Sequence, residues 1–431
     1  MAQLFVRHVR REKMSYKSID GTRQWDESKR MPEERMVVKM QSFAKTGVTP
    51  DIAGADLSYA LKLQYERWKE KGLKSTMEIV PVGNKPQISY PGFFWNDEKY
   101  THIRKYDYGK KIQKYYKDGK CIHTKESQVG INAIVTNTTV DSSIVENDIY
   151  NCPSCGAGIR IKELMEGCPY CQSKFMMTDL FPKVTNFYLY EDDDSSKVNL
   201  MLIPAIIGGL VAYIYEFLFL MPEHDLLNIL LGAIAIPFGA IAGYILGVIP
   251  FMGYAIYKAI AGIGAVGASK IAEKKIEKKM KSIDNAFSYK LFESQLISFL
   301  KMTLFTSDYK NLACFEGTSI PEKYRDLVDM SYNGVIKLKS IETVGDVVKL
   351  NVQVPMRNTY YNKKIKIKDE KINLQIARKI TTHTNSGFSI KRVACKSCGG
   401  SFDGTHQRIC PFCNSAYDMK EEGWVITEIM G

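Results

Sequence analysis

Eight of the ten cysteines fall into four Cys-x-x-Cys pairs, and these pairs come in two sets. In each set the two pairs are about a dozen residues apart, a spacing typical of structural zinc sites. Four thiolates in this arrangement can surround one tetrahedral Zn²⁺, with each pair forming one side of the site. The predicted ligands are Cys152, Cys155, Cys168 and Cys171 for the first site and Cys395, Cys398, Cys410 and Cys413 for the second.

The residues beside these cysteines favour a metal site over other uses of thiols. Gly156 and Gly399 follow the second cysteine of a pair, where glycine accepts a left-handed backbone freely. Disulfides would require an oxidising compartment, and iron in a four-thiolate site stays an alternative. Protein side chains fill all four positions of each site, so we expect two structural Zn ions rather than a catalytic zinc with a position open for water. Cys121 and Cys314 are isolated in the sequence.

An apolar tract separates the two cysteine sets. Leu200–Met221 and Leu226–Ile249 are each long enough to cross a hydrocarbon core of about 30 Å as a helix. Pro250–Ala268 is a third apolar stretch, so the tract predicts two spans and leaves a third open. Two spans place both cysteine sets on one, reducing side of the membrane. We therefore expect a multi-pass protein of the cell membrane with both zinc modules in the cytoplasm.

A lysine-rich segment follows the apolar tract, as is typical of the cytoplasmic side of membrane proteins. Within it, Ala272, Ile276 and Met280 recur at helical spacing and predict an amphipathic helix. Two interpretations stay open: the helix lies on anionic lipid, or it packs its apolar stripe on its own domain. On the first interpretation the lipid-binding residues are Lys270, Lys274, Lys275, Lys278, Lys279 and Lys281.

The N-terminal part is basic. The chain carries a formal net charge of +12, which eight thiolates and two Zn²⁺ would lower by about 4. Lysines and tyrosines interleave along Lys99–Lys120. Aromatic residues among cations suit stacking on single-stranded nucleic acid, and they equally suit strands with one buried tyrosine face and one solvated lysine face. The strand interpretation is favoured, and nucleic-acid binding is the alternative function.

The C-terminal part combines helical and strand patterns. Ala286–Phe305 has aliphatic and aromatic residues at helical spacing, and Leu327–Tyr332 is expected to close a second helical region. Strand-like alternation follows along Val335–Val344, Val347–Val354, Lys364–Ile380, Phe388–Val393 and Trp424–Ile429. The second cysteine set is therefore expected to lie between two strands of one sheet.

Helices followed by a curved antiparallel sheet, directly after a membrane segment, make the region from about Asn285 to Gly431 resemble a known domain. It resembles the C-terminal domain of the mitochondrial inner-membrane import subunit of 44 kDa and its bacterial relatives. Several bacterial relatives carry a four-cysteine ribbon just before a final strand that begins with Trp-Val, as Trp424-Val425 does here. The resemblance implies a cone-like α+β domain with an apolar pocket, which is not an enzyme, binds membrane lipid and recruits partner proteins, in mitochondria for protein import.

These patterns predict an α+β multidomain membrane protein. We expect a membrane-anchored, zinc-binding adaptor or tether in protein transport, with no catalytic residues and with anionic lipid and an unidentified protein as partners. The alternative is a membrane-tethered nucleic-acid-binding protein. The expected parts are a basic α/β region over 1–150, a zinc ribbon over 151–176, the transmembrane segment over 199–268, the amphipathic helix over 269–284, and the import-subunit-like domain over 285–431 with its ribbon at 394–416.

Overall fold

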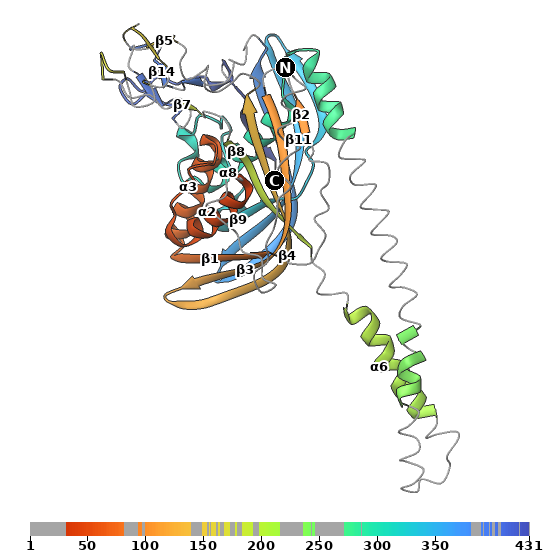
Figure 1. Cartoon of the computed structure of the whole chain (residues 1–431). Coiled ribbons are helices and arrows are strands. Elements are labelled where there is room, and N and C mark those ends of the chain that lie inside the picture. Colours follow the sequence, from red (N-terminus) through yellow and green to blue (C-terminus); the bar gives the residue numbers. More distant parts are fainter. Residues whose placement is uncertain are drawn as a thin grey trace, which may run out of the picture. The chain divides into compact units, whose positions relative to one another are not determined.

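A computed structural model divides the chain into two compact units (Figure 1). Unit 1 comprises Met1–Glu191 and Ala272–Gly431, and unit 2 comprises Asp192–Ile271. The residues that the structure describes are 32–81, 94–96, 100–138, 149–152, 155, 157–160, 163, 168–172, 177–178, 183–192, 198–215, 236–242, 244–245, 271–285, 287–380, 389–390, 392–395, 397–398, 401–403, 407–421 and 423–430.

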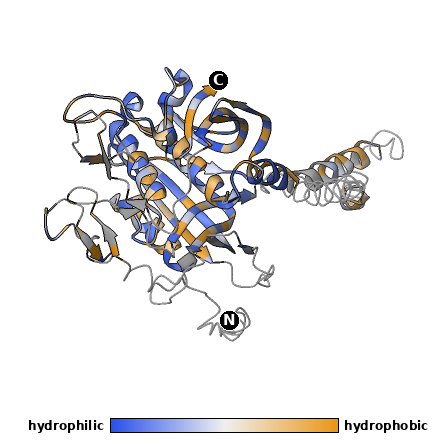
Figure 2. Cartoon of the chain, turned by 90° about the horizontal axis from the view of Figure 1, so that it is seen from above, coloured by the Kyte–Doolittle hydropathy of each residue, from blue (hydrophilic) through white to orange (hydrophobic). Residues whose placement is uncertain are grey.

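Unit 1 contains two five-stranded sheets. The strands of the first sheet are β1 (Leu73–Pro81), β2 (Phe94–Asn96), β3 (Tyr100–Lys117), β4 (Lys120–Thr138) and β8 (Lys183–Asp192). Those of the second sheet are β9 (Leu327–Tyr332), β10 (Lys337–Val344), β11 (Val347–Asn362), β12 (Lys364–Lys379) and β16 (Val425–Met430). The first sheet has the order β1-β3-β4-β8 with β2 on β3, and the second has the order β10-β11-β12-β16 with β9 on β11. Hydrophilic and hydrophobic residues alternate along these strands (Figure 2), as expected of sheets with one buried face.

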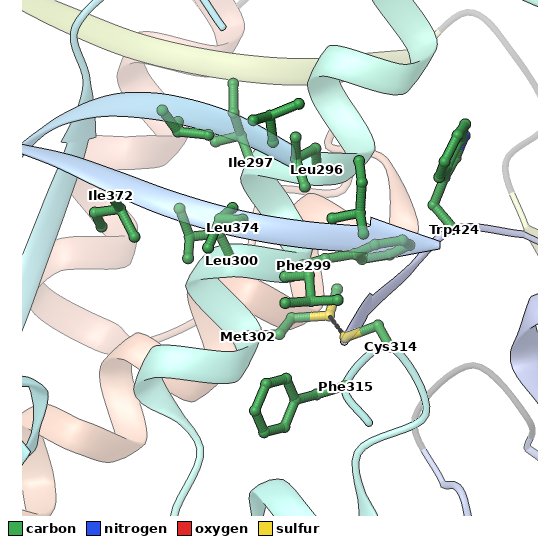
Figure 3. Close-up of a cluster of buried hydrophobic side chains, with 14 of the residues drawn as sticks. Leu296, Ile297, Phe299, Leu300, Met302, Cys314, Phe315, Ile372, Leu374 and Trp424 are labelled. Atoms are coloured by element: carbon green, nitrogen blue, oxygen red, sulfur yellow. Dashed lines mark hydrogen bonds between the residues drawn. The ribbon is translucent and has the colours of Figure 1, made fainter. Parts of the chain in front are cut away.

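The helices of unit 1 include α2 (Pro32–Thr46), α3 (Ala55–Glu70) and α8 (Tyr289–Phe305). Helix α8 begins where the Ser288 hydroxyl accepts a hydrogen bond from the Leu291 amide at 3.2 Å, which satisfies one free donor of the first turn. Nearly every side chain of α8 is buried, so this helix forms the centre of the core. In Figure 3, Leu300 of α8 lies beside Leu374 of β12, and Met302 lies 4.0 Å from Cys314 between the sulfur atoms.

Helix α3 joins the N-terminal and C-terminal parts of unit 1. The Arg67 guanidinium donates hydrogen bonds to the carbonyl oxygens of Phe305 at 3.1 Å and Thr306 at 3.3 Å. These carbonyls lie at the C-terminal end of α8, where the helix dipole favours a positive charge. The Trp68 indole donates to the Val328 carbonyl of β9. The N-terminal and C-terminal parts therefore lie in one compact unit, with Ala60 and Leu63 of α3 in the core around α8 and Val328 of β9 in the core of the first sheet.

A buried carboxylate also connects the two sheets. Glu191 of β8 pairs with Lys111 of β3, with Lys125 of β4 at 2.6 Å and with Arg357 of β11 at 3.1 Å. Burial alone would raise the pKa of Glu191, but the attraction of Lys111 and Lys125 outweighs it and lowers the pKa to about 2. Glu191 is therefore charged at neutral pH and balances cations from both sheets.

The helix expected at Leu327–Tyr332 is wrong, because this segment is strand β9. It pairs antiparallel with β11, with Tyr332 opposite Met356. Val328 is fully buried and packs against the core of the first sheet. Apolar and polar residues alternate from Val328 to Tyr332, a strand pattern that the expectation of a helix overlooked.

The predicted transmembrane hairpin is also wrong, and with it the multi-pass placement in the cell membrane. Among the described residues, no helix is long and apolar enough to cross a membrane. The first predicted span forms α6 (Val198–Tyr215), whose 18 residues include Pro204. The second predicted span is described over 236–242 and 244–245, and the third lies outside the described residues. The α+β part of the predicted fold class is confirmed.

Within unit 2, Gly239 makes a close helix–helix contact. A Cβ atom at Gly239 would lie 2.4 Å from the Ala212 Cβ and 2.5 Å from the Gly208 carbonyl oxygen of α6. A small residue is therefore required at this crossing.

Candidate metal centres

The eight predicted cysteine ligands assemble into two tetrads. In each tetrad, here called ribbon 1 (Cys152, Cys155, Cys168, Cys171) and ribbon 2 (Cys395, Cys398, Cys410, Cys413), all four Sγ atoms lie within 4.8 Å of one another. Both groups fit a metal ion. The described residues form no third group of this kind.

The sulfur spacing fits a tetrahedral metal ion better than a disulfide. Four sulfurs at about 2.3 Å from a central Zn²⁺ would lie about 3.8 Å from one another. In ribbon 1 the Cys152–Cys171 and Cys155–Cys168 sulfur distances are both 3.7 Å. In ribbon 2 the Cys395–Cys413 distance is 3.5 Å and the Cys398–Cys410 distance is 3.8 Å. A disulfide bond is about 2.05 Å long. The sulfurs of each tetrad are therefore not bonded to one another, and they surround one position that fits a metal ion.

Ribbon 1 is built on a short hairpin of β5 (Ile149–Asn151) and β6 (Gly158–Arg160). The Cys152 amide donates to the Ala157 carbonyl at 2.8 Å and closes the first knuckle. The Gln172 amide donates to the Cys168 carbonyl at 2.9 Å and closes the second, with Gln172 at a φ of 57°. Cys152, Cys168 and Ile159 form a small apolar cluster with Ala157 beside it.

Ribbon 2 repeats this design on β14 (Arg392–Ala394) and β15 (Ser401–Asp403). The Asn414 amide donates to the Cys410 carbonyl at 2.9 Å, with Asn414 at a φ of 60°. The rings of Phe402 and Tyr417 meet edge to face with centroids 5.8 Å apart. This contact extends the apolar interior of ribbon 2 beyond its cysteines.

Ribbon 2 is fastened to the α+β body of unit 1. The Arg408 amide donates to the Asn311 carbonyl at 2.7 Å, and the Ile409 amide donates to the Asn311 Oδ1 at 3.0 Å. Tyr417 packs against both ribbon 2 and the main core around α8. Beside this attachment is an open hollow of about 280 Å³, lined by Asp308, Lys310, Asn311, Gln407, Ile409, Cys410, Pro411 and Asn414.

A two-stranded sheet connects the chain segments next to the two ribbons. Strand β7 (Met177–Thr178) follows ribbon 1, and strand β13 (Ser389–Ile390) precedes ribbon 2. They pair antiparallel, with Ser389 opposite Thr178; Figure 1 labels β7 near β14. Two ribbons far apart in sequence are thereby tied together through the backbone.

One hydroxyl group touches the sulfur ligands of ribbon 2. Ser415 Oγ lies 2.9 Å from the Cys395 Sγ and 3.1 Å from the Cys413 Sγ. In the metal-free form, the hydrogen bond from Ser415 is the main cause that lowers the pKa of Cys395 to about 5, and it also lowers the pKa of Cys413. The sequence prediction missed Ser415, although its position two residues after the last ligand is a usable signal.

Each ribbon exposes one aromatic side chain on its second knuckle. Tyr170 in Cys-Pro-Tyr-Cys is 74% exposed, and Phe412 in Cys-Pro-Phe-Cys is 66% exposed. The sequence prediction used the cysteines and prolines of these knuckles and missed the aromatic residues. Their identical place in both ribbons is the signal that identifies them.

The apolar stripe of the lysine-rich segment packs on its own domain, which was the second of the two interpretations. Residues 271–281 form a helix, and Ile276 and Met280 are each 1% exposed within the core around α8. Lys281 pairs with Glu277 at 2.8 Å. The exposed predicted lipid-binding residues are Lys274, Lys275, Lys278 and Lys279, and Lys270 lies outside the described residues.

The lysine and tyrosine segment forms strand β3, as the favoured interpretation expected. Tyr115 is buried and donates a hydrogen bond to Asp329 at 3.2 Å. Lys111 is paired with Glu191, and Lys117 donates to the Lys71 carbonyl. These side chains are used inside unit 1, which leaves fewer of them for stacking on nucleic acid.

Neither isolated cysteine joins a metal group. Cys314 is fully buried beside Met302, and Cys121 is exposed at the start of β4 near Thr124. Neither residue belongs to the two tetrads.

Three comparisons with known proteins returned no match: no family model, no curated protein and no solved structure is similar to this chain at a significant level. The resemblance to the import-subunit domain therefore rests on the residue pattern alone.

Proposed function

We propose that this protein is a zinc-binding adaptor whose two ribbons together form the docking surface for a partner protein. The observation that carries the proposal is the exposure of Tyr170 and Phe412 at the same knuckle position of both ribbons. Aromatic residues dominate the energy of protein interfaces because they bury a large area at a low entropy cost. The β7–β13 pairing supports the use of both ribbons by one partner.

Zinc has a structural role in this proposal. Each tetrad provides four sulfur ligands, and such closed sites stabilise a small fold without leaving a position for substrate. The ribbons have small apolar clusters of their own, so the metal supplies the stability that presents Tyr170 and Phe412 in a fixed geometry.

A protein partner is favoured over nucleic acid by the use of β3 side chains within unit 1. Tyr115 and Lys111 are buried in contacts with Asp329 and Glu191. A stacking platform requires these aromatic and basic groups at the surface. A role in protein transport stays an implication of the resemblance and enters the proposal only as a candidate pathway for the partner.

The test is site-specific photo-crosslinking of the full chain in cells. A photoreactive phenylalanine analogue is placed at position 170 or 412, and, as a control, at the exposed Ile122 of β4. We expect the same discrete protein adduct from positions 170 and 412, unaffected by nuclease, absent from position 122 and lost in Cys410→Ser. Equal adducts at all three positions, or adducts that nuclease removes, would overturn the proposal.

A further inference from the structure

Ser415 lies at the outer edge of the ribbon 2 metal centre, and its side chain is directed at two ligands at once. Its Oγ is 2.9 Å from one sulfur (Cys395) and 3.1 Å from another (Cys413). The Ser415 carbonyl accepts the Cys410 amide at 2.9 Å, which holds the residue in place. The half-buried position of Ser415 limits competition from water for its hydroxyl.

The chemistry of metal-bound sulfur gives this contact a consequence. A thiolate has no proton to donate, so the Ser415 hydroxyl must be the donor, to one sulfur at a time. Such a hydrogen bond withdraws electron density from the sulfur, and partners of this kind orient and tune metal ligands. A less electron-rich thiolate attacks electrophiles more slowly, because the attack uses the sulfur lone pair that the hydrogen bond engages.

We infer that Ser415 is a positioning residue of the second metal centre, whose hydroxyl shields the Cys395 and Cys413 thiolates from electrophiles. Cys413 is exposed, whereas Cys395 is buried. When Ser415 donates to Cys413, the hydrogen bond therefore protects the sulfur that solvent-borne reagents reach first. The inference rests on metal binding by ribbon 2, which is part of the proposed function, and does not depend on the partner.

Substitution distinguishes two roles for Ser415. Its hydroxyl either lowers the reactivity of the thiolates or only fills space beside them. Ser415→Ala removes the hydroxyl and keeps the backbone hydrogen bond from the Cys410 amide. Ser415→Thr keeps the hydroxyl and this backbone hydrogen bond. The matched control is Ser397→Ala. Ser397 is exposed and donates to the Cys395 Sγ through its backbone amide at 3.4 Å, which alanine retains.

The experiment uses full-length zinc-loaded protein and pulsed alkylation with N-ethylmaleimide, resolved by peptide mass spectrometry at each cysteine. We expect Ser415→Ala to raise the initial alkylation rate of Cys413 about tenfold, the size typical of lost outer hydrogen bonds at metal sites. The ribbon 1 cysteines serve as internal reference and should keep their wild-type rates. Ser415→Thr and Ser397→Ala should match the wild type.

Replacing zinc with cobalt distinguishes a change in the electron density of the thiolates from a loss of metal binding. With Co²⁺ in both tetrads, Ser415→Ala should retain two metal ions and move part of the sulfur-to-cobalt charge-transfer band to longer wavelength, because the thiolate becomes more electron-rich. An unchanged Cys413 rate and band would overturn the inference, as would a Thr variant that behaves like Ala. Wild-type protein without metal in ribbon 2 would instead contradict the proposed function itself.

Discussion

The two ribbons share a ligand pattern, a knuckle geometry and an exposed aromatic residue, but their surroundings differ. Ribbon 2 is bonded to the α+β body through Asn311 and packs on its core through Tyr417. The described apolar contacts of ribbon 1 stay within its own cluster of Cys152, Ile159 and Cys168 with Ala157 beside it. Over the described residues, similar ligand sets are thus placed in one case on the α+β body and in the other on a small cluster that is connected to ribbon 2 through the β7–β13 pairing.

This difference shows that one set of residues forms the metal site and another, distant set forms the structure that supports it. The ligands need only a local spacing, so each tetrad can form wherever the knuckles fold. The support of ribbon 2 needs residues about a hundred positions away, and the stability of the body therefore contributes to the stability of ribbon 2. The predictions below test this asymmetry, from the largest expected effect to the smallest.

Removing one ligand from either ribbon should have the largest effect. The effect should stay local in ribbon 1 and extend into the α+β body from ribbon 2. Metal binding to structural sites contributes on the order of 10 kcal/mol to folding. We expect Cys168→Ser and Cys410→Ser each to lose one metal ion. The Cys168→Ser change should increase proteolysis only around ribbon 1, while Cys410→Ser should also increase amide exchange near Asn311. Metal analysis and hydrogen exchange measure both. Identical exchange maps, or full metal content in either variant, would contradict the asymmetry.

Neutralising Glu191 should weaken the support of ribbon 2 and leave ribbon 1 unaffected. Glu191→Gln leaves the buried Lys111 without this carboxylate, while Arg357 keeps its pair with Asp369, and breaking a buried pair costs about 3–5 kcal/mol. We expect a lower free energy of unfolding in urea at pH 7. Metal transfer to a chelator should become faster from ribbon 2 alone.

Glu191→Gln also tests how the stability of the fold depends on pH. The folded pKa of Glu191 is lowered to about 2, below an ordinary value of about 4.3. Its stabilising contribution is therefore complete above the unfolded pKa and is lost as pH falls toward the folded pKa. Between about pH 4.3 and 2, wild-type stability should fall more steeply than that of Glu191→Gln. Parallel curves would show that Glu191 does not carry this effect.

Replacing the side chain that holds ribbon 2 should have the smallest effect. Asn311→Ala removes the acceptor of the Ile409 amide and leaves the backbone bond to Arg408. A net loss of about 1 kcal/mol is expected for one such hydrogen bond. Hydrogen exchange at Ile409 should rise severalfold while ribbon 1 exchange stays constant. Asn333→Ala, which removes a surface bond to Asp369, is the matched control and should leave Ile409 unchanged.

The sequence predicted those features that depend on neighbours along the chain. The cysteine spacing identified both tetrads, and the apolar stripe through Ile276 and Met280 identified a helix that does bury this face. The sequence also predicted a strand over Trp424–Ile429, and β16 (Val425–Met430) confirms it. Periodicity and ligand spacing are local properties, so one sequence suffices to recognise them.

Features that depend on distant partners could not be predicted. The pairing of Leu327–Tyr332 with β11 is such a feature, although the alternation of apolar and polar residues from Val328 to Tyr332 was a readable strand signal. The β7–β13 pairing and the Arg67 contact with the end of α8 each join residues more than 200 positions apart. The apolar composition of Leu200–Met221 suggested a membrane span, but no helix among the described residues is long and apolar enough to cross a membrane.

The most direct test of the account is the metal content of the purified full-length protein, measured by native mass spectrometry together with elemental analysis. The account predicts two zinc ions per chain, with eight cysteines protected from alkylation until a chelator is added. Fewer than two metal ions, or eight cysteines joined in disulfides, would contradict it. Iron in place of zinc would keep the two tetrads and correct the identity of the metal.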